Sequence, residues 1–180
     1  MKLLLMSGKK NAYRWRAKDS KTKFKLFGLL TEQRSYENGT KILFKTIKNK
    51  CGTQFIERAK RGRKIVFVSD KLGHYKKGFN KYFRYVAELR FGISIKQKKY
   101  GYKHNNNVIE RDNREVKQRY YPMIGFKELN SANNVLDLLD TYDNYIEDKE
   151  NKTPAQRAGI ELNLGKRYQF LNLIKVSKIK

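Results

Sequence analysis

Apolar and polar residues alternate with a short period near the start of the chain. An apolar run over residues 3–6 ends in Ser-Gly-Lys-Lys-Asn, which is typical of a turn. Over residues 12–17, aromatic and alanine side chains alternate with Arg14 and Arg16, as expected of a strand with one buried face and one face toward solvent. A second polar turn leads to residues 24–30, which are rich in residues favoured in strands. Three strands joined by short turns predict an antiparallel meander.

The spacing then becomes helical, with one continuous apolar run in between. Ile65-Val66-Phe67-Val68 contains no polar position, which indicates a strand buried on both faces, and it is followed by Ser69-Asp70. Apolar residues at helical spacing mark four other segments. We therefore expect helices near residues 42–47, 75–90, 108–121 and 129–146, and a further short strand at residues 92–96.

The order of these elements predicts an α/β protein, because three antiparallel strands are followed by alternating helices and strands. Such an order favours a mixed sheet covered on both faces, and it fits the ribonuclease H-like fold. We expect residues 1–125 to form this core and residues 126–180 to form a C-terminal helical extension.

The charge of the chain points to a polyanionic partner. Lys and Arg total 42 and Asp and Glu total 17, so the formal net charge is +25 on 180 residues. Aromatic residues make up 13% of the chain, which argues against a disordered basic tail. Nucleic acid is the first candidate for a partner that neutralises this charge, and an acidic membrane surface is the second.

Several classes of protein are excluded by the sequence. No stretch approaches the roughly 20 apolar residues that span a bilayer, so we expect no membrane-spanning segment. The single cysteine, Cys51, excludes a disulfide framework and a cysteine-based zinc site. His74 and His104 are too few to hold zinc alone. A reducing, cytoplasmic compartment is the expected location.

The segment 137–150 reverses the charge trend, since it holds six acidic residues and one lysine. Such a segment is most often a solvated helix face, and we expect that here. The alternative is that it docks on the basic surface when DNA is absent.

Two carboxylates stand out as candidate metal ligands. Asp70 follows the buried strand, where a catalytic carboxylate would lie, although a turn or helix cap is the alternative. Glu110 lies 40 positions later, on a predicted helix, where it could instead form a surface ion pair with Arg114. Arg114 and Lys117 share the helix face of Glu110, and Arg111 is adjacent, so these cations could hold a DNA backbone beside the acid.

At these positions the sequence resembles the DDE transposases of bacterial and archaeal insertion sequences. Residues 106–111 and 117–119 resemble the third-acid motif of that family, and residues 68–75 resemble its second-acid segment. Further similar segments occur in the family's order, at residues 13–19, 125–127, 131–132, 142–145 and 153–160.

The resemblance implies metal-dependent cutting and joining of DNA ends. It makes Asp70 the second and Glu110 the third catalytic, metal-binding acid, with Mg²⁺ or Mn²⁺ as cofactor, two ions in a complete site. It also implies DNA contacts by basic residues near the third acid, namely Arg111, Arg114, Lys117 and Arg119. DNA, as transposon ends and target, is the expected partner, together with a second copy or a full-length transposase, in association with the nucleoid.

The first acid of the family has no counterpart on the first predicted strand, and its expected position falls at or just before Met1. The chain therefore resembles a transposase truncated at the edge of its active site. Asp19 is the nearest acid, but a Lys-Asp-Ser-Lys turn is its expected setting.

Three functional hypotheses remain open from the sequence. The first is a transposase catalytic domain, active when the site is completed. The second is an inactive truncated transposase that only binds DNA. The third is a basic protein that binds RNA or the ribosome.

Overall fold

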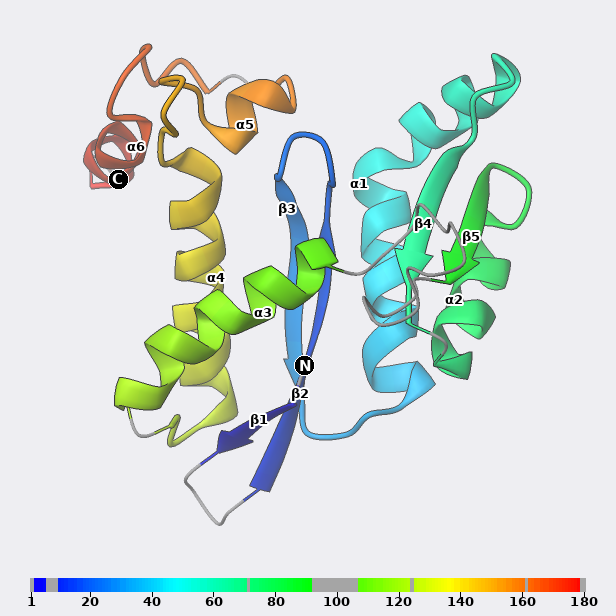
Figure 1. The fold of residues 1–180 in the computed structure, drawn as a ribbon, viewed down its shortest axis with the longest axis horizontal. Helices are drawn as coiled ribbons and strands as arrows, with labels where there is room; N and C mark the ends of the chain where they lie inside the picture. The colour runs from blue at the N-terminus through cyan, green and yellow to red at the C-terminus, as the bar shows by residue number, and fades with distance from the viewer. Residues whose placement is uncertain are drawn as a thin grey trace, which may run out of the picture.

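The computed structural model describes residues 2–5, 10–70, 72–91, 107–123, 125–160 and 162–178. Its first three strands are β1 (Lys2–Leu5), β2 (Lys10–Lys18) and β3 (Lys25–Thr31). They pair antiparallel in the order β1-β2-β3, so the predicted meander is confirmed. The β2–β3 pair lies in the middle of the molecule (Figure 1).

A second, two-stranded sheet follows a long helix. A π-helical turn over Tyr36–Thr40 leads directly into α1 (Lys41–Lys60), which extends far beyond the helix expected near residues 42–47. β4 (Ile65–Ser69) and β5 (Ala87–Phe91) then pair in parallel, with α2 (Gly73–Phe83) as their connection. Within the described part of the chain, this pair is separate from the first sheet.

The helix expected over residues 75–90 is wrong at its end, because α2 ends at Phe83 and Ala87–Phe91 is a strand. Val86 and Leu89 continue the helical stripe by their spacing, but Ala87 and Leu89 also alternate with polar residues, and pairing with β4 favours the strand. The strand predicted at 92–96 lies outside the described residues. β4 itself is half-buried along its whole length, so the prediction of a strand buried on both faces is also wrong.

The β2–β3 pair separates two hydrophobic clusters. On one side lies an aromatic cluster from α1, α2 and β4, in which the rings of Phe55 and Phe67 stack at 5.4 Å between centroids. Ala17 and Phe27 pack against it from the sheet. On the other side, Ala12 and Leu30 join a cluster with residues of the C-terminal half of the chain: Val116, Phe126, Ala132 and Leu136. Helices thus cover both faces of this part of the sheet (Figure 1).

The second cluster is formed with α3 (Asn107–Tyr120) and α4 (Leu129–Tyr145), which agree within a residue or two with the predicted helices. A short helical turn over Tyr121–Met123 contains Pro122 and separates them. Two shorter helices follow, α5 (Pro154–Arg157) and α6 (Gln169–Ser177). Thr153 begins α5 with a capping box, since its Oγ1 accepts a hydrogen bond from the Gln156 backbone N–H at 3.1 Å.

The structure is therefore a mixed α/β fold with two small sheets and helices on both sides of the first. Two glycines permit close contacts within it. A Cβ atom on Gly39 would lie 2.1 Å from the Trp15 ring, and one on Gly28 would lie 2.8 Å from the carboxylate of Asp140 on α4. The second contact indicates how closely α4 approaches β3.

Candidate functional site

Asp70 lies immediately after β4, at the carboxyl end of the parallel β4–β5 pair, as predicted. Its side chain is 53% exposed, and the Nη2 atom of Arg34 lies 3.8 Å from its Oδ2 atom. Its Oδ1 atom accepts a hydrogen bond from the Leu72 backbone N–H at 3.3 Å. Carboxyl ends of parallel strands are where ligands commonly bind in α/β sheets, so this exposed carboxylate is well located for a metal ligand. The bond to Leu72 fits a turn-capping role equally well.

The side chain of Tyr75 packs behind Asp70. Its ring meets the rings of Trp15 and Phe44 edge to face, with centroid separations of 5.9 and 6.4 Å. Burial, followed by the negative charge of Asp70, raises the pKa of Tyr75 to about 12. The phenol therefore stays protonated at neutral pH and does not serve as a base beside Asp70.

Glu110 lies in the first turn of α3, and its side chain is exposed. A carboxylate at this end of a helix is stabilised by the helix dipole. No ion pair joins Glu110 to Arg114 among the residues that the structure describes. Within the same described ranges, no hydrogen bond or ion pair links Glu110 to the elements around Asp70, so the convergence of these two acids stays a prediction.

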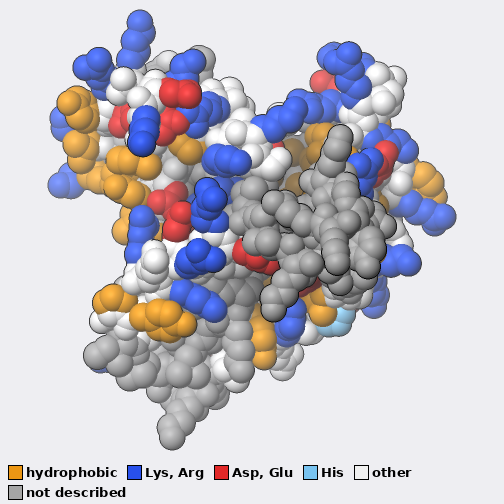
Figure 2. Space-filling model, in the orientation of Figure 1, with side chains coloured by type: hydrophobic (Ala, Val, Ile, Leu, Met, Phe, Trp, Pro, Cys, Tyr) orange, Lys and Arg blue, Asp and Glu red, His pale blue; other side chains and the backbone are white. Residues whose placement is uncertain are grey.

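The four predicted DNA-binding cations of α3 differ in their surroundings. Arg111 and Arg114 are exposed, and Lys117 is half-buried. Arg119 contacts α4 instead, since its Nη1 atom lies 3.5 Å from Asp143 and its guanidinium lies over the Tyr142 ring at 5.7 Å from the centroid. Figure 2 shows Lys and Arg side chains along the region of the surface where Figure 1 places α3.

A buried ionic cluster anchors α3 to the sheet. The side chain of Asp112, two residues after Glu110, is fully buried. Its Oδ2 atom pairs with Arg16 of β2, and its Oδ1 atom lies 3.1 Å from Lys18 and 3.2 Å from Lys25. Cations from both β2 and β3 therefore meet one carboxylate of α3.

The same cluster continues into α4. Asp140 pairs with Arg14 at 2.6 Å, with Arg16 at 2.9 Å and with Lys25 at 3.3 Å, and Lys25 also pairs with Asp143. Two expectations from the sequence are therefore wrong. Arg14 and Arg16 are 3% and 9% exposed, so this face of β2 is not solvated. Asp140 and Asp143 lie on the cations of the sheet, as in the alternative of a docked acidic segment, while Asp137, Asp148 and Glu150 of the same segment are exposed.

The alternation of β2 explains both corrections. Ala12, Arg14, Arg16 and Lys18 share the face toward α3 and α4, while Trp15 and Ala17 face the aromatic cluster. Three cations on alternate positions of an aromatic strand were the sequence signal for a buried ionic layer. The sequence alone does not show which acids pair with these cations, because the acids lie on α3 and α4, far away in the chain.

Electrostatics favour the charged form of Asp112. Burial alone would raise the pKa of the Asp112 carboxyl, but the charges of Arg16, Lys25 and Lys18 outweigh it, and the pKa lies below its usual range. Burial lowers the pKa of Arg14, and the neighbouring Arg16 acts in the same direction.

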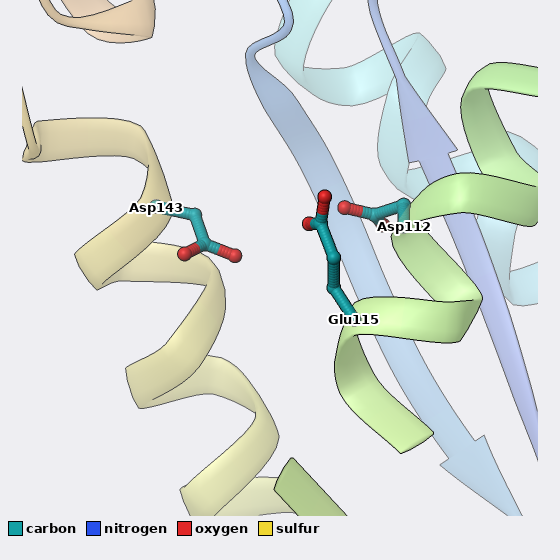
Figure 3. Close-up of side chains that lie close together, drawn as sticks. All are labelled: Asp112, Glu115 and Asp143. Atoms are coloured by element: carbon teal, nitrogen blue, oxygen red, sulfur yellow. The ribbon is translucent and has the colours of Figure 1, made fainter. Parts of the chain in front are cut away.

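One group of acids has a spacing compatible with a metal ion. Asp112 and Glu115 of α3 and Asp143 of α4 each offer an oxygen, and these atoms lie within 4.8 Å of one another (Figure 3). Both oxygens of Asp112 already contact cations, and Asp143 contacts Lys25 and Arg119. Two of the three donors, Asp112 and Asp143, are thus neutralised by cations of the protein itself, which does not fit a divalent ion. This group, the one found among the described residues, contains neither Asp70 nor Glu110.

Asp19 lies in the predicted turn. Its Oδ2 atom accepts hydrogen bonds from the Thr22 backbone N–H at 2.7 Å and from the Thr22 hydroxyl at 2.6 Å. The carboxylate therefore closes the β2–β3 turn and is not a substitute for a first catalytic acid.

Comparisons with known proteins identify the family. A family model described as a DDE domain matches residues 4–146, which is most of the chain and includes both Asp70 and Glu110. Searches of the curated proteins and of the solved structures gave no match. None of the helices in the described ranges is long and apolar enough to cross a membrane. With the family match over residues 4–146, and with an acid at the end of β4 and another on α3, the chain belongs to the DDE transposase family of insertion sequences.

Proposed function

We propose that the chain is a transposase catalytic domain that cleaves and transfers DNA strands with a divalent metal ion held by Asp70 and Glu110. The observation that carries this proposal is the DDE-domain match over residues 4–146, which includes both acids. The exposed position of Asp70 at the end of a parallel strand pair supports it.

The ribonuclease H-like fold is part of this proposal. In that fold, the β1-β2-β3 meander and the parallel β4–β5 pair would belong to one mixed sheet. The antiparallel order, the parallel pair and helices on both faces of the first sheet all support it. We propose residues 1–125 as the catalytic core and residues 126–180 as the helical extension.

The donor chemistry of the two acids fits Mg²⁺ or Mn²⁺. Both are exposed carboxylates, and Mg²⁺ is typically held by one or two carboxylates, with waters and substrate phosphates completing its shell. A bound divalent ion would stabilise the negative charge on the phosphate and activate the attacking oxygen. Asp70 and Glu110 would fix the position of that ion.

The cations of α3 would hold the DNA backbone next to Glu110. Arg111 and Arg114 are exposed on the same helix, so their guanidinium groups can donate hydrogen bonds to phosphate oxygens. Lys117 would add charge from the next turn. Arg119 would contribute its charge, although it is engaged with α4.

The first test is DNA cleavage with Mg²⁺ or Mn²⁺, using DNA from the borders of the chain's own gene. Asp70→Asn and Glu110→Gln should abolish cutting and leave DNA binding unchanged, because each substitution removes a charge and keeps the shape. Glu115→Gln is the matched control, since Glu115 is an exposed acid on the same helix and should be dispensable. Equal activity of Glu110→Gln and the unsubstituted chain would refute the proposal.

The second candidate is a chain that binds DNA without cutting it. The observation in its favour is that none of the residues at the start of β1 is acidic, since the strand reads Lys-Leu-Leu-Leu. In that case Glu110→Gln changes neither DNA cleavage nor DNA binding, and the chain would affect transposition by associating with a full-length transposase or a second copy. The codons upstream of Met1 discriminate between the two candidates. An in-frame aspartate codon there supports the catalytic domain, and an in-frame stop codon supports the chain that only binds DNA. Preference for RNA over border DNA in direct competition would contradict both.

A further inference from the structure

We propose that Asp112 is a positioning residue for Glu110: it fixes the first half of α3 on the sheet and thereby sets where the Glu110 carboxylate lies. This inference rests on the proposed role of Glu110 as a metal ligand. It follows from the buried contacts of Asp112, which the sequence did not reveal.

Asp112 supplies the polar anchor of the first half of α3. From Ile109 to Asn113, where side chains are described, Asp112 is the buried residue, with 1% exposure, while Glu110 and Arg111 are exposed. The apolar anchor of α3, Val116, lies one turn later and packs with Ala12 and Leu30. Among the described side chains of this half, Asp112 makes the ion pairs with the sheet.

The geometry of the contact restrains both the position and the rotation of α3. One oxygen of Asp112 pairs with Arg16 of β2, and the other lies between Lys18 of β2 and Lys25 of β3. An apolar side chain would fix only the distance between helix and sheet. Two oxygens held by separate cations also fix the direction of the Cα–Cβ bond, and with it the rotation of the helix.

Glu110 is coupled to this anchor by helix geometry. Two residues correspond to a rise of about 3 Å and a turn of about 200°, so Glu110 projects away from the sheet when Asp112 projects into it. This agrees with the exposed Glu110 and the buried Asp112. A rotation or slide of the first half of α3 moves the Glu110 carboxylate by a similar distance, and displacements of about 1 Å are enough to impair catalysis.

A general structural role is the competing explanation, and Asp140 provides the control. Asp140 belongs to the same cluster and contacts Arg14, Arg16 and Lys25, but it lies on α4. Removing its charge disturbs the same cations and leaves the anchor of α3 in place. A general loss of stability would affect both variants alike.

The experiment measures Mn²⁺ binding to the full chain by titration calorimetry and by the electron paramagnetic resonance of free Mn²⁺. Glu110→Gln first defines the Glu110-dependent site. Asp112→Asn should then weaken binding at that site by about 10-fold to 100-fold, the range typical of residues that orient metal ligands. Asp140→Asn should leave the affinity within about twofold, because Asp140 lies on α4 and the contacts of Asp112 with Arg16, Lys18 and Lys25 remain. In the Glu110→Gln background, Asp112→Asn should have no further effect.

Amide hydrogen exchange gives a second measurement that needs no metal. Asp112→Asn should speed exchange in the first half of α3, whereas Asp140→Asn should act on α4. If Asp112→Asn does not fold, Asp112→Glu keeps the charge, lengthens the side chain by one methylene and should still weaken Mn²⁺ binding.

The outcomes separate this inference from the proposed function. Absence of any Glu110-dependent Mn²⁺ binding refutes the proposed function, and the exchange data alone then decide whether Asp112 anchors α3. Glu110-dependent binding that Asp112→Asn and Asp140→Asn weaken equally overturns the inference while leaving the proposed function intact. Equal exchange in α3 for both variants overturns it as well.

Discussion

The substitution Asp140→Asn tests whether the buried ionic cluster stabilises the fold. Asp140 contacts three cations, Arg14, Arg16 and Lys25, at 2.6, 2.9 and 3.3 Å. The cluster holds four cations, Arg14, Arg16, Lys18 and Lys25, and three acids, Asp112, Asp140 and Asp143, which gives 4 − 3 = +1. The asparagine raises this to +2 in a buried site.

The expected cost follows from which cations keep a partner. Breaking a buried ion pair by removing one member costs about 3–5 kcal/mol. Arg16 and Lys25 retain Asp112, whereas Arg14 keeps its hydrogen bond to the Leu136 carbonyl at 3.2 Å and loses the carboxylate, so we expect the lower end, about 3 kcal/mol. For a domain of this size, about 2–4 °C per kcal/mol corresponds to a fall in Tm of about 6–12 °C.

The assay is urea and thermal unfolding followed by circular dichroism, with Asp137→Asn as the control. Asp137 is an exposed acid on the same helix, and its replacement should change stability by no more than about 0.5 kcal/mol. A double variant, Arg14→Met with Asp140→Leu, should be more stable than Asp140→Leu alone, because the cation that loses its carboxylate is removed with it. A loss below about 1 kcal/mol for Asp140→Asn, typical of surface pairs, would refute the reasoning.

Three further predictions concern packing, pH and DNA binding. Gly39→Ala should destabilise the chain by about 1–3 kcal/mol, because the added Cβ atom would overpack against the Trp15 ring. Gly52→Ala in α1 is the control and should not, because its added Cβ atom would lie 3.6 Å from the nearest atom, in Lys48. Equal stability of the two variants would contradict this. Burial raises the pKa of Asp19, but its hydrogen bonds from Thr22 outweigh that and lower it, so its stabilising contribution is complete above about pH 4 and is lost as the pH falls through the lowered value. Asp19→Asn should therefore flatten the acid limb of a stability curve measured from pH 2 to 6, and an unchanged limb would count against it. Alanine at both Arg111 and Arg114 should reduce the slope of log binding constant against log salt concentration for DNA by about 1.8 in magnitude, because each phosphate that is no longer neutralised lowers it by about 0.9. Alanine at both Lys149 and Lys152 is the control and should leave that slope unchanged.

Local patterns in the sequence were sufficient to predict much of the fold. The alternation in residues 12–17 and the polar turns around it predicted β2 and the meander, because pleat and turn chemistry are local. The α2–β5 boundary was mispredicted because Leu89 fits a helical spacing with Val86 and a strand spacing with Ala87, and only pairing with β4 decides between them.

In the candidate site, too, the local features were predictable from the sequence and the long-range contacts were not. The location of Asp70 after a strand and of Glu110 in the first turn of a helix followed from sequence, and both are confirmed. The roles of Asp112, Asp140 and Asp143 did not follow, because each depends on a partner more than 90 positions away in the chain or on a different element. Acidic residues on a helix are usually solvated, and the cations on β2 and Lys25 of β3 make burial favourable here.

The placement of the acids also bears on how the chain would meet DNA. Because the buried cluster has a net charge of +1, nearly all of the formal +25, that is 25 − 1 = +24, lies outside it. Three of the 17 acids are used to hold β2, β3, α3 and α4 together, where they cannot repel a phosphate backbone. The ionic cluster thus fixes the helix that carries Glu110 and takes up only one unit of the net positive charge that would attract a polyanionic substrate.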